Sequence, residues 1–282
     1  MDNIKPTEVV KTMLGAGAAK AGLPPRDLLI RGFLSGALLG FSTSLALTAT
    51  AQTNLPIVGA LVFPVGFVMI VLLGLELVTG SFALVPLAGV DGRRPWGRVG
   101  SSLAWLFLGN LAGSVAYAWL LCLVLTSCGA HPPSGIALKL IAAAEAKTNA
   151  YAADGGAGWM TAFVKGVLCN WMVCLGVVLG MTSTSTLGKI AACWLPIVTF
   201  FAQGFEHSVV NMFVIPAGMM LGAKVSLADW WLWNQLPVTL GNFAGGLLFT
   251  GLFLYWTYRG EPGAARAAAR PVPELEGEPA RA

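Results

Sequence analysis

The chain has 282 residues, of which 56% are hydrophobic and only 11% are charged. A typical soluble domain has about 25% charged residues, so this composition excludes an ordinary soluble protein and indicates a chain that faces lipid. The net charge of +4 forms no basic stripe, and nucleic acid is therefore not an expected partner. The five cysteines follow neither metal-ligand nor disulfide spacing, and we expect no metal and no cofactor.

The first 27 residues form a mixed polar segment without the basic start and apolar core of a secretory signal. Within it, residues 7–22 predict a short amphipathic helix, with Thr7 as its N-cap. Pro24 and Pro25 end this helix.

Six apolar stretches follow, and each exceeds the ~20 residues that cross a bilayer core. Their limits are 28–51, 57–90, 99–129, 158–181, 190–222 and 230–258. Residues 28–258 are therefore expected to form one all-α membrane domain with six spans. The remaining residues, 259–282, are rich in Ala, Pro, Arg and Glu, and this composition predicts a disordered tail.

The second and fifth stretches are too long for straight spans and contain helix breakers. The breakers are Pro64, Gly66, Gly74, Gly80 and Pro86 in the second stretch, and Pro196, Gly204, Pro216 and Gly218 in the fifth. We therefore interpret both as broken helices, interrupted around residues 74–80 and 204–211.

The distribution of basic residues predicts the orientation, because cytoplasmic loops carry an excess of Lys and Arg. With six spans, both termini lie on the same side. That side carries Lys5, Lys11, Lys20, Arg26, Arg31, Arg93, Arg94, Arg98, Lys189, Arg259, Arg266, Arg270 and Arg281, and the other side only Lys139, Lys147 and Lys224. Both termini are therefore expected in the cytoplasm.

A weak internal repeat relates residues 28–129 to residues 158–258. Three short matches occur in the same order at offsets of 134, 130 and 132: RGFL with KGVL, GLE with GFE, and LGNLAG with LGNFAG. Each half contains three spans, so the second half enters the membrane inverted. Inverted repeats place their pathway near the bilayer midplane, where broken helices meet. The repeat therefore predicts that the pathway lies at the two breaks.

His207 is the most informative residue at the breaks, because ionisable groups at membrane depth usually face a protein interior or an aqueous path. Its imidazole could share a proton with an anion or offer it one hydrogen bond. Alternatively, a backbone carbonyl or a Glu satisfies the ring, which then only holds the break in shape. The exposed N–H groups of a broken helix also favour an anion.

Glu76 and Glu206 are related by the repeat and could bind a cation or relay protons. The simpler interpretation, which we favour, is that each accepts bonds from broken-helix N–H groups or pairs with a cation such as Lys165. Thr79 and Asn170 either line a path or form interhelical hydrogen bonds. Five further residues, at the breaks or at helix contacts, are interpreted as structural: Gly74, Gly204, Asn211, Asn110 and Asn242.

Aromatic residues gather near the breaks, at Phe63, Phe67, Phe200, Phe201 and Phe205. Such rings can gate a pore by excluding water, although aromatic side chains in membrane helices often serve only packing.

Four motifs resemble the formate/nitrite transporter family. They are GFEHSVVNMF followed by Ile215-Pro216-Ala217-Gly218, CNWMVCL (169–175), PVTLGNFAGG (237–246) and FPVGFVMIVLLGLELVTGS (63–81). The similarity covers nearly residues 1–258.

The resemblance implies an aquaporin-like bundle that assembles as a homopentamer, with one pore in each subunit. It implies that His207 is the central pore histidine and that Thr79 faces it. Phe63 and Phe200 match one constriction, whereas Phe67, Leu77 and Val78 match the other. Asn170 matches a residue beside the pore, and Lys147 and Lys165 are both candidates for an outer lysine that attracts anions.

These observations predict an inner-membrane channel that carries a small monovalent anion, formate or nitrite, with protons shared at His207. A water or glycerol channel is the main alternative, but it would contain paired Asn-Pro-Ala motifs, which are absent from the sequence. An intramembrane enzyme would need a nucleophile with a base, and neither is evident. A cation transporter would use Glu76 and Glu206.

Overall fold

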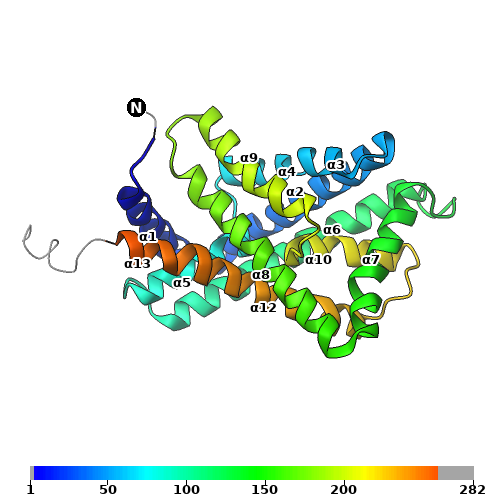
Figure 1. Cartoon of the computed structure of the whole chain (residues 1–282). Coiled ribbons are helices and arrows are strands. Elements are labelled where there is room, and N and C mark those ends of the chain that lie inside the picture. Colours follow the sequence, from blue (N-terminus) through cyan, green and yellow to red (C-terminus); the bar gives the residue numbers. More distant parts are fainter. Residues whose placement is uncertain (1–2, 260–282) are drawn as a thin grey trace, which may run out of the picture.

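The computed structural model describes residues 3–259, and within this range the chain is helical apart from one isolated bridge between Asn3 and Ser183 (Figure 1). The predicted disordered tail lies, from residue 260 onward, outside the described residues. The helices are α1 (Pro6–Gly22), α2 (Pro25–Thr53), α3 (Pro56–Val62), α4 (Pro64–Leu72), α5 (Val78–Val90), α6 (Trp96–Leu125), α7 (Ile136–Ala153), α8 (Gly155–Gly180), α9 (Thr186–Ala202), α10 (Ser208–Met220), α11 (Leu227–Trp230), α12 (Leu236–Ala244) and α13 (Phe253–Tyr258). Two π-helical segments, Trp231–Gln235 and Gly245–Leu252, join α11 to α12 and α12 to α13.

Four helices of the described chain are long and apolar enough to cross a bilayer. These are α2, α6, α8 and the continuous stretch from Leu227 to Tyr258. The second and fifth stretches are each divided into shorter apolar helices, with α3 and α4 followed by α5, and α9 followed by α10. The predicted interruptions are therefore present.

Glycines allow the long helices to approach closely. A Cβ on Gly113 of α6 would collide with the carbonyl of Phe33 on α2, and one on Gly241 of α12 would collide with the carbonyl of Phe163 on α8. Because a glycine has no Cβ, each pair of helix backbones can come into direct contact.

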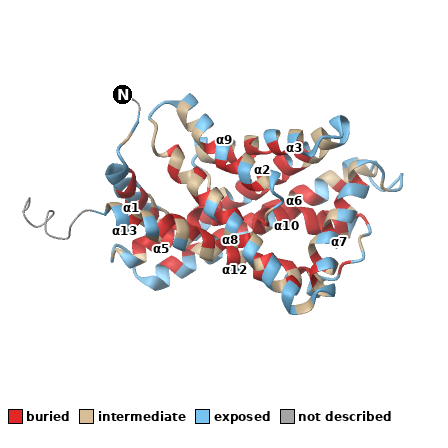
Figure 2. Ribbon diagram, in the orientation of Figure 1, coloured by how far each residue is buried: buried red, intermediate tan, exposed pale blue. Residues whose placement is uncertain are grey.

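The buried residues run through the middle of the bundle, whereas large apolar side chains remain exposed on its outside (Figure 2). The short helices α5 and α10 are buried along almost their whole length. The exposed apolar side chains include Phe41 on α2, Leu61 on α3, Trp119 on α6 and Leu195 on α9. An apolar exterior of this kind suits contact with lipid or with another subunit.

The ends of the described chain lie together. Helix α1 packs Val9 and Met13 against Leu84 of α5 and Tyr255 of α13, at the left of Figure 1. Pro6 is the first residue of α1 and Lys5 its N-cap, so the prediction of Thr7 as the cap was wrong. At the opposite end lies α7, an 18-residue helix between the predicted third and fourth apolar stretches.

Candidate functional site at two helix breaks

The two breaks have the same backbone geometry. After α4, the N–H of Leu75 donates to the carbonyl of Ile70 at 3.0 Å, and Gly74 has a φ of +61°. After α9, the N–H of Phe205 donates to the carbonyl of Phe200 at 3.2 Å, and Gly204 has a φ of +66°. This pattern is a Schellman motif, in which a left-handed glycine ends the helix. The chain then runs without helix to Leu77 and to His207.

Two asparagines close the breaks with matching hydrogen bonds. The Oδ1 atom of Asn110 accepts from the N–H of Val78 at 2.8 Å, and its Nδ2 atom donates to the carbonyls of Gly32 (2.8 Å) and Glu76 (3.0 Å). Each asparagine therefore satisfies backbone groups that a helix break leaves open.

Asn242 repeats this arrangement in the second half. Its Oδ1 atom accepts from the N–H of Ser208 at 2.9 Å, and its Nδ2 atom donates to the carbonyls of Gly166 (2.8 Å) and Glu206 (2.9 Å). The partners are the residues that the sequence repeat pairs, since Gly166 matches Gly32 and Glu206 matches Glu76.

Each break carries a buried carboxylate that pairs with a lysine from a helix outside the long spans. Lys20 of α1 donates to Glu76 at 2.6 Å, and Lys147 of α7 donates to Glu206 at 2.7 Å. Both carboxylate side chains are at most 5% exposed. Each glutamate therefore pairs with a cation, which was one of the two expected alternatives, but the cations are Lys20 and Lys147 and not Lys165. The N–H groups of Val78 and Ser208 donate to Asn110 and Asn242 instead of to the glutamates.

Glu206 has two further donors, so its negative charge is well satisfied. The hydroxyl of Tyr151 donates at 2.9 Å and the Nδ2 atom of Asn211 donates at 2.8 Å. Burial, and secondarily the Glu206 carboxylate, raise the pKa of the Tyr151 phenol, so this group stays protonated and donates. Asn211 also donates to Asn234, which extends the network to the last span.

His207 is the N-cap of α10 and faces Thr79 of the other break. Its Nδ1 atom accepts from the N–H of Val210 at 3.2 Å, and its Nε2 atom lies 3.0 Å from the Thr79 hydroxyl. Because Nδ1 accepts, the ring proton sits on Nε2 and is directed at Thr79. Both side chains are buried, His207 at 3% exposure and Thr79 at 0%. The neutral imidazole is the form that satisfies both contacts.

Aromatic rings adjoin the histidine on one side. Phe200 stacks on the His207 ring at 5.8 Å between centroids, and Phe63 meets Phe200 edge-on at 5.9 Å. Phe201 stacks on Phe63 at 3.9 Å. The structure therefore brings Phe63, Phe200 and His207 together.

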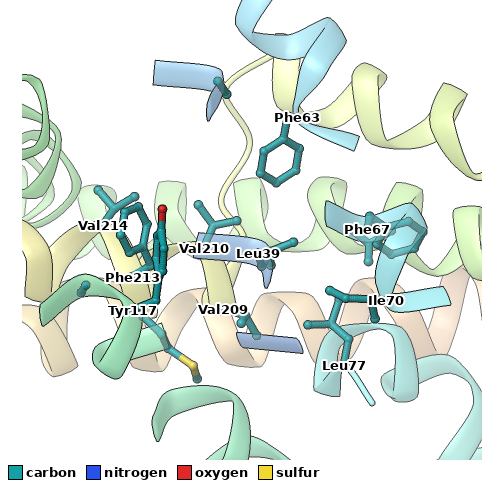
Figure 3. Packing of buried hydrophobic residues seen from close by; sticks show 14 of the residues in the cluster. Leu39, Phe63, Phe67, Ile70, Leu77, Tyr117, Val209, Val210, Phe213 and Val214 are labelled. Carbon is teal, nitrogen blue, oxygen red and sulfur yellow. The ribbon is translucent and has the colours of Figure 1, made fainter. Parts of the chain in front are cut away.

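Phe67, Ile70 and Leu77 lie near one another (Figure 3) and line a cavity of about 510 Å³. Lys20 and Lys189 also line this cavity, which lies between α1, the first break and the end of α8. Val78 is buried and is the first residue of α5. The apolar ring in contact with the polar pair of His207 and Thr79 is that of Phe200.

Asn170 and Lys165 both belong to α8, but their side chains contact different groups. The Nδ2 atom of Asn170 donates to the carbonyls of Thr79 (3.0 Å) and Asn242 (2.6 Å), and its Oδ1 atom has no partner among the described residues. The ammonium of Lys165 lies 5.6 Å from the centre of the Tyr151 ring, a cation–π distance. Its backbone carbonyl accepts from the N–H of Glu206 at 3.4 Å.

Sequence reasoning did not identify Lys20 and Tyr151 as site residues, and it gave Lys147 no carboxylate partner. One signal was present: a segment rich in helix-forming residues precedes each half, and each contains a lysine, 56 residues before Glu76 and 59 before Glu206. Extending the repeat outward to these segments would have paired the lysines with the glutamates.

The fold and site define a class of multi-pass membrane protein in which two broken helices meet at a buried polar pair. A family model described as "Formate/nitrite transporter" matches residues 7–256. The chain belongs to the formate/nitrite transporter family, a family of membrane transporters and channels.

Several relatives support this membership. A "Probable formate transporter" from Methanothermobacter thermautotrophicus is 35% identical, and the alignment covers 90% of this chain and 96% of the relative. "Formate channel FocA" from Escherichia coli (strain K12) is 29% identical, with 90% and 94% covered. Among solved structures, an "FNT family ion channel" aligns with a TM-score of 0.77 at 29% identity, covering 89% of this chain and 99% of that one. A "Pentameric formate channel with formate bound" has the same fold, with a TM-score of 0.67 at 24% identity and coverage of 83% and 97%.

Proposed function

We propose that this chain is a channel for small monovalent anions, with formate or nitrite as its substrate. Three findings support the proposal: the family model, the printed names of the relatives, and a pentameric structural neighbour that holds formate. The subunits assemble as a homopentamer in the inner membrane, each with its own pore. We expect no enzymatic activity and no cofactor.

The bundle has six spans arranged as an inverted repeat with an aquaporin-like architecture, from residues 28–129 and 158–258. The four long helices and the two broken stretches supply six crossings. The matched hydrogen bonds of Asn110 and Asn242, at repeat-related positions, support the internal symmetry. Residues 1–27 form the cytoplasmic helix that precedes the channel domain, and residues 259–282 form its tail.

Both termini lie in the cytoplasm. The excess of Lys and Arg at one set of loops supports this orientation. The packing of α1 against α13 supports a common side for both ends. In this orientation the cavity beside Phe67 and Leu77 opens to the cytoplasm, and α7 with Lys147, Lys165 and Glu206 lies toward the outside.

The pathway passes His207 and Thr79 between two apolar constrictions. Phe63 and Phe200 form one, and the other consists of Phe67, Leu77 and Val78. The observation that carries the proposal is the contact between His207 Nε2 and the Thr79 hydroxyl, a polar pair held by both breaks and flanked by aromatic rings. An anion that crosses a dry constriction loses hydration, and a hydrogen-bond donor at that point lowers the cost.

Protons take part because the substrate is the anion of a weak acid. In the resting geometry, neutral His207 offers its Nε2 proton as a hydrogen bond. Full proton transfer requires the imidazolium, whose Nδ1–H would face the N–H of Val210, so that contact must open first. An anion next to the ring favours this charged form, for which the imidazole takes up a proton from the aqueous side. Transfer of the Nε2 proton to the anion then gives the neutral acid, which crosses the apolar constriction, and His207 returns to its neutral form.

Lys165 assists the entry of the anion, and Asn170 assists its passage. The charge of Lys147 is balanced by Glu206, whereas Lys165 has no ion pair among residues 3–259 and supplies attraction for an incoming anion. The free Oδ1 atom of Asn170 offers an acceptor beside Thr79 for a protonated substrate. Glu76, Gly74, Gly204 and Asn211 hold the breaks in shape.

Uptake into proteoliposomes that contain the purified protein tests the function. We expect labelled formate and nitrite to enter much faster than into empty liposomes, with mutual competition between the two anions. Osmotic swelling in glycerol should match that of empty liposomes. Swelling in glycerol without anion uptake would replace the proposal with a neutral-solute channel.

A further inference from the structure

The carbonyl of Thr79 receives two side-chain donors from the same helix. The Nδ2 atom of Asn170 donates at 3.0 Å, and the thiol of Cys174, one turn further along α8, donates at 3.1 Å. The Nδ2 atom of Asn170 also contacts the sulfur of Cys174, at 3.5 Å. Two donors on α8 therefore hold the carbonyl of Thr79, the residue whose hydroxyl faces His207.

The donors occupy a space that the chain keeps free for them. Asn170 and Cys174 are both fully buried. A Cβ on Gly246 would lie 2.7 Å from Asn170 Nδ2 and 2.7 Å from Cys174 Sγ, so any side chain at this position would displace the two donors. Gly246 belongs to the π-helical segment Gly245–Leu252, which places this glycine opposite α8. The contact between α8 and the first turn of α5 is therefore supported from a third helix.

The direction of the Thr79 hydroxyl depends on the backbone that carries it. Thr79 lies in the first turn of α5, immediately after the break, where the chain has fewer helical hydrogen bonds to fix it. A peptide carbonyl with two donors at fixed positions rotates less than one with a single donor. A thiol is a weak donor, so its contribution is a small but directional one.

We infer that Cys174 is a positioning residue for the pair formed by Thr79 and His207, and through that pair for anion passage. The inference rests on the proposed channel function. It assigns the thiol a role beyond packing: together with Asn170 it fixes the Thr79 peptide so that the hydroxyl meets His207 Nε2. Cys174 touches neither the anion nor the imidazole.

The test compares Cys174→Ala, which removes the donor, with Cys174→Ser, which keeps one. Cys122→Ala is the matched control, because its thiol is also buried and contacts a carbonyl, that of Ala217 on α10, at 3.6 Å. Each full-length protein is reconstituted at equal pentamer density. The initial rate of formate uptake is then measured across pH, together with thermal unfolding.

We expect Cys174→Ala to lower the uptake rate about two- to fivefold, the factor that corresponds to losing one weak hydrogen bond. The midpoint of the pH dependence should move as well, because His207 loses a well-placed acceptor. Cys174→Ser should recover most of the rate and the original midpoint. Cys122→Ala should resemble the unmodified protein, even if both alanine variants unfold at lower temperature.

An infrared measurement keeps the test independent of how well the alanine variant folds. The S–H stretching band that is absent from Cys174→Ser belongs to Cys174, and we expect formate, but not an equal concentration of chloride, to shift it. An unmoved band, or a Cys174→Ala profile equal to that of Cys122→Ala, would overturn the positioning role. Failure of the unmodified protein to take up formate would instead contradict the proposed function.

Discussion

His207 and Thr79 are 128 residues apart in the chain, yet the imidazole Nε2 atom and the threonine hydroxyl meet at 3.0 Å. Each residue follows a helix break, and each break is closed by an asparagine that binds the same three kinds of backbone group. The contact therefore joins the two halves of the chain at their two helix breaks.

Replacing Thr79 separates the role of its hydroxyl from that of its shape. Thr79→Val keeps the volume but removes the acceptor for the Nε2 proton of His207, which leaves a buried donor unpaired. That loss costs about 1–3 kcal/mol. We expect formate uptake to fall at least about fivefold, and Thr79→Ser to retain most of it. Equal uptake by the valine and serine variants would show that the hydroxyl does not take part.

Removal of Lys147 should destabilise the protein more than removal of Lys165. In Lys147→Met the buried Glu206 carboxylate loses its counter-charge, which we expect to cost about 2 kcal/mol because the lysine side chain is itself 24% exposed. Thermal unfolding in detergent measures the effect. Lys165→Met, which removes no ion pair of the described chain, should unfold near the original temperature.

A compensating change checks the cause of that loss. Glu206→Gln added to Lys147→Met removes the unpaired charge, and the double variant should recover part of the stability. A double variant that is less stable than Lys147→Met alone would contradict this account of the ion pair.

The glycines at the breaks should tolerate few replacements although space is available. No atom lies within 4 Å of a Cβ built on Gly74 or Gly204, so an alanine meets no clash there. The left-handed backbone alone makes Gly74→Ala unfavourable by about 1–2 kcal/mol. Gly74→Asn should cost less, because asparagine adopts this conformation more readily. Unfolding temperatures of the two variants check this order.

Gly246→Ala should impair transport through displacement of Asn170 and Cys174. The added methyl group would lie 2.7 Å from both donors and would push them away from the Thr79 carbonyl. We expect slower formate uptake from correctly assembled protein. Gly100→Ala on α6 is the control, because no atom lies within 4 Å of its Cβ and alanine favours a helix. Equal uptake by both variants would contradict the expected displacement.

The helix breaks and the residues around them could be predicted from the sequence because their signals are local or repeated. Gly74 and Gly204 interrupt apolar stretches that are too long to be straight, and both have left-handed backbones in the structure. Asn110 and Asn242 stand out through the repeated motif LGNxAG. The chemistry of a helix terminus requires only a few neighbouring residues, and the sequence displays them.

The similar spacing of Lys20 and Lys147 before the two glutamates could have suggested these partners, but it could not establish them. Lys20 and Lys147 reach Glu76 and Glu206 only because α1 and α7 fold back over the breaks, and this return depends on packing between distant helices. Lys165 was the cation that the sequence analysis named as a partner for a glutamate, but its side chain lies over the ring of Tyr151 instead. The π-helical segments Trp231–Gln235 and Gly245–Leu252 of the last span were also not foreseen, because no feature of their sequences distinguishes them from the α-helix around them.

The central claim is that His207 lies on the path of the anion, and the pH dependence of formate uptake by His207→Phe tests it most directly. Phenylalanine fills the site but has neither the Nε2 donor nor a titratable nitrogen. We predict that pentamers of this variant assemble in liposomes and lose the pH-dependent component of uptake that the unmodified protein shows. Uptake with an unchanged rate and an unchanged pH profile would contradict the claim.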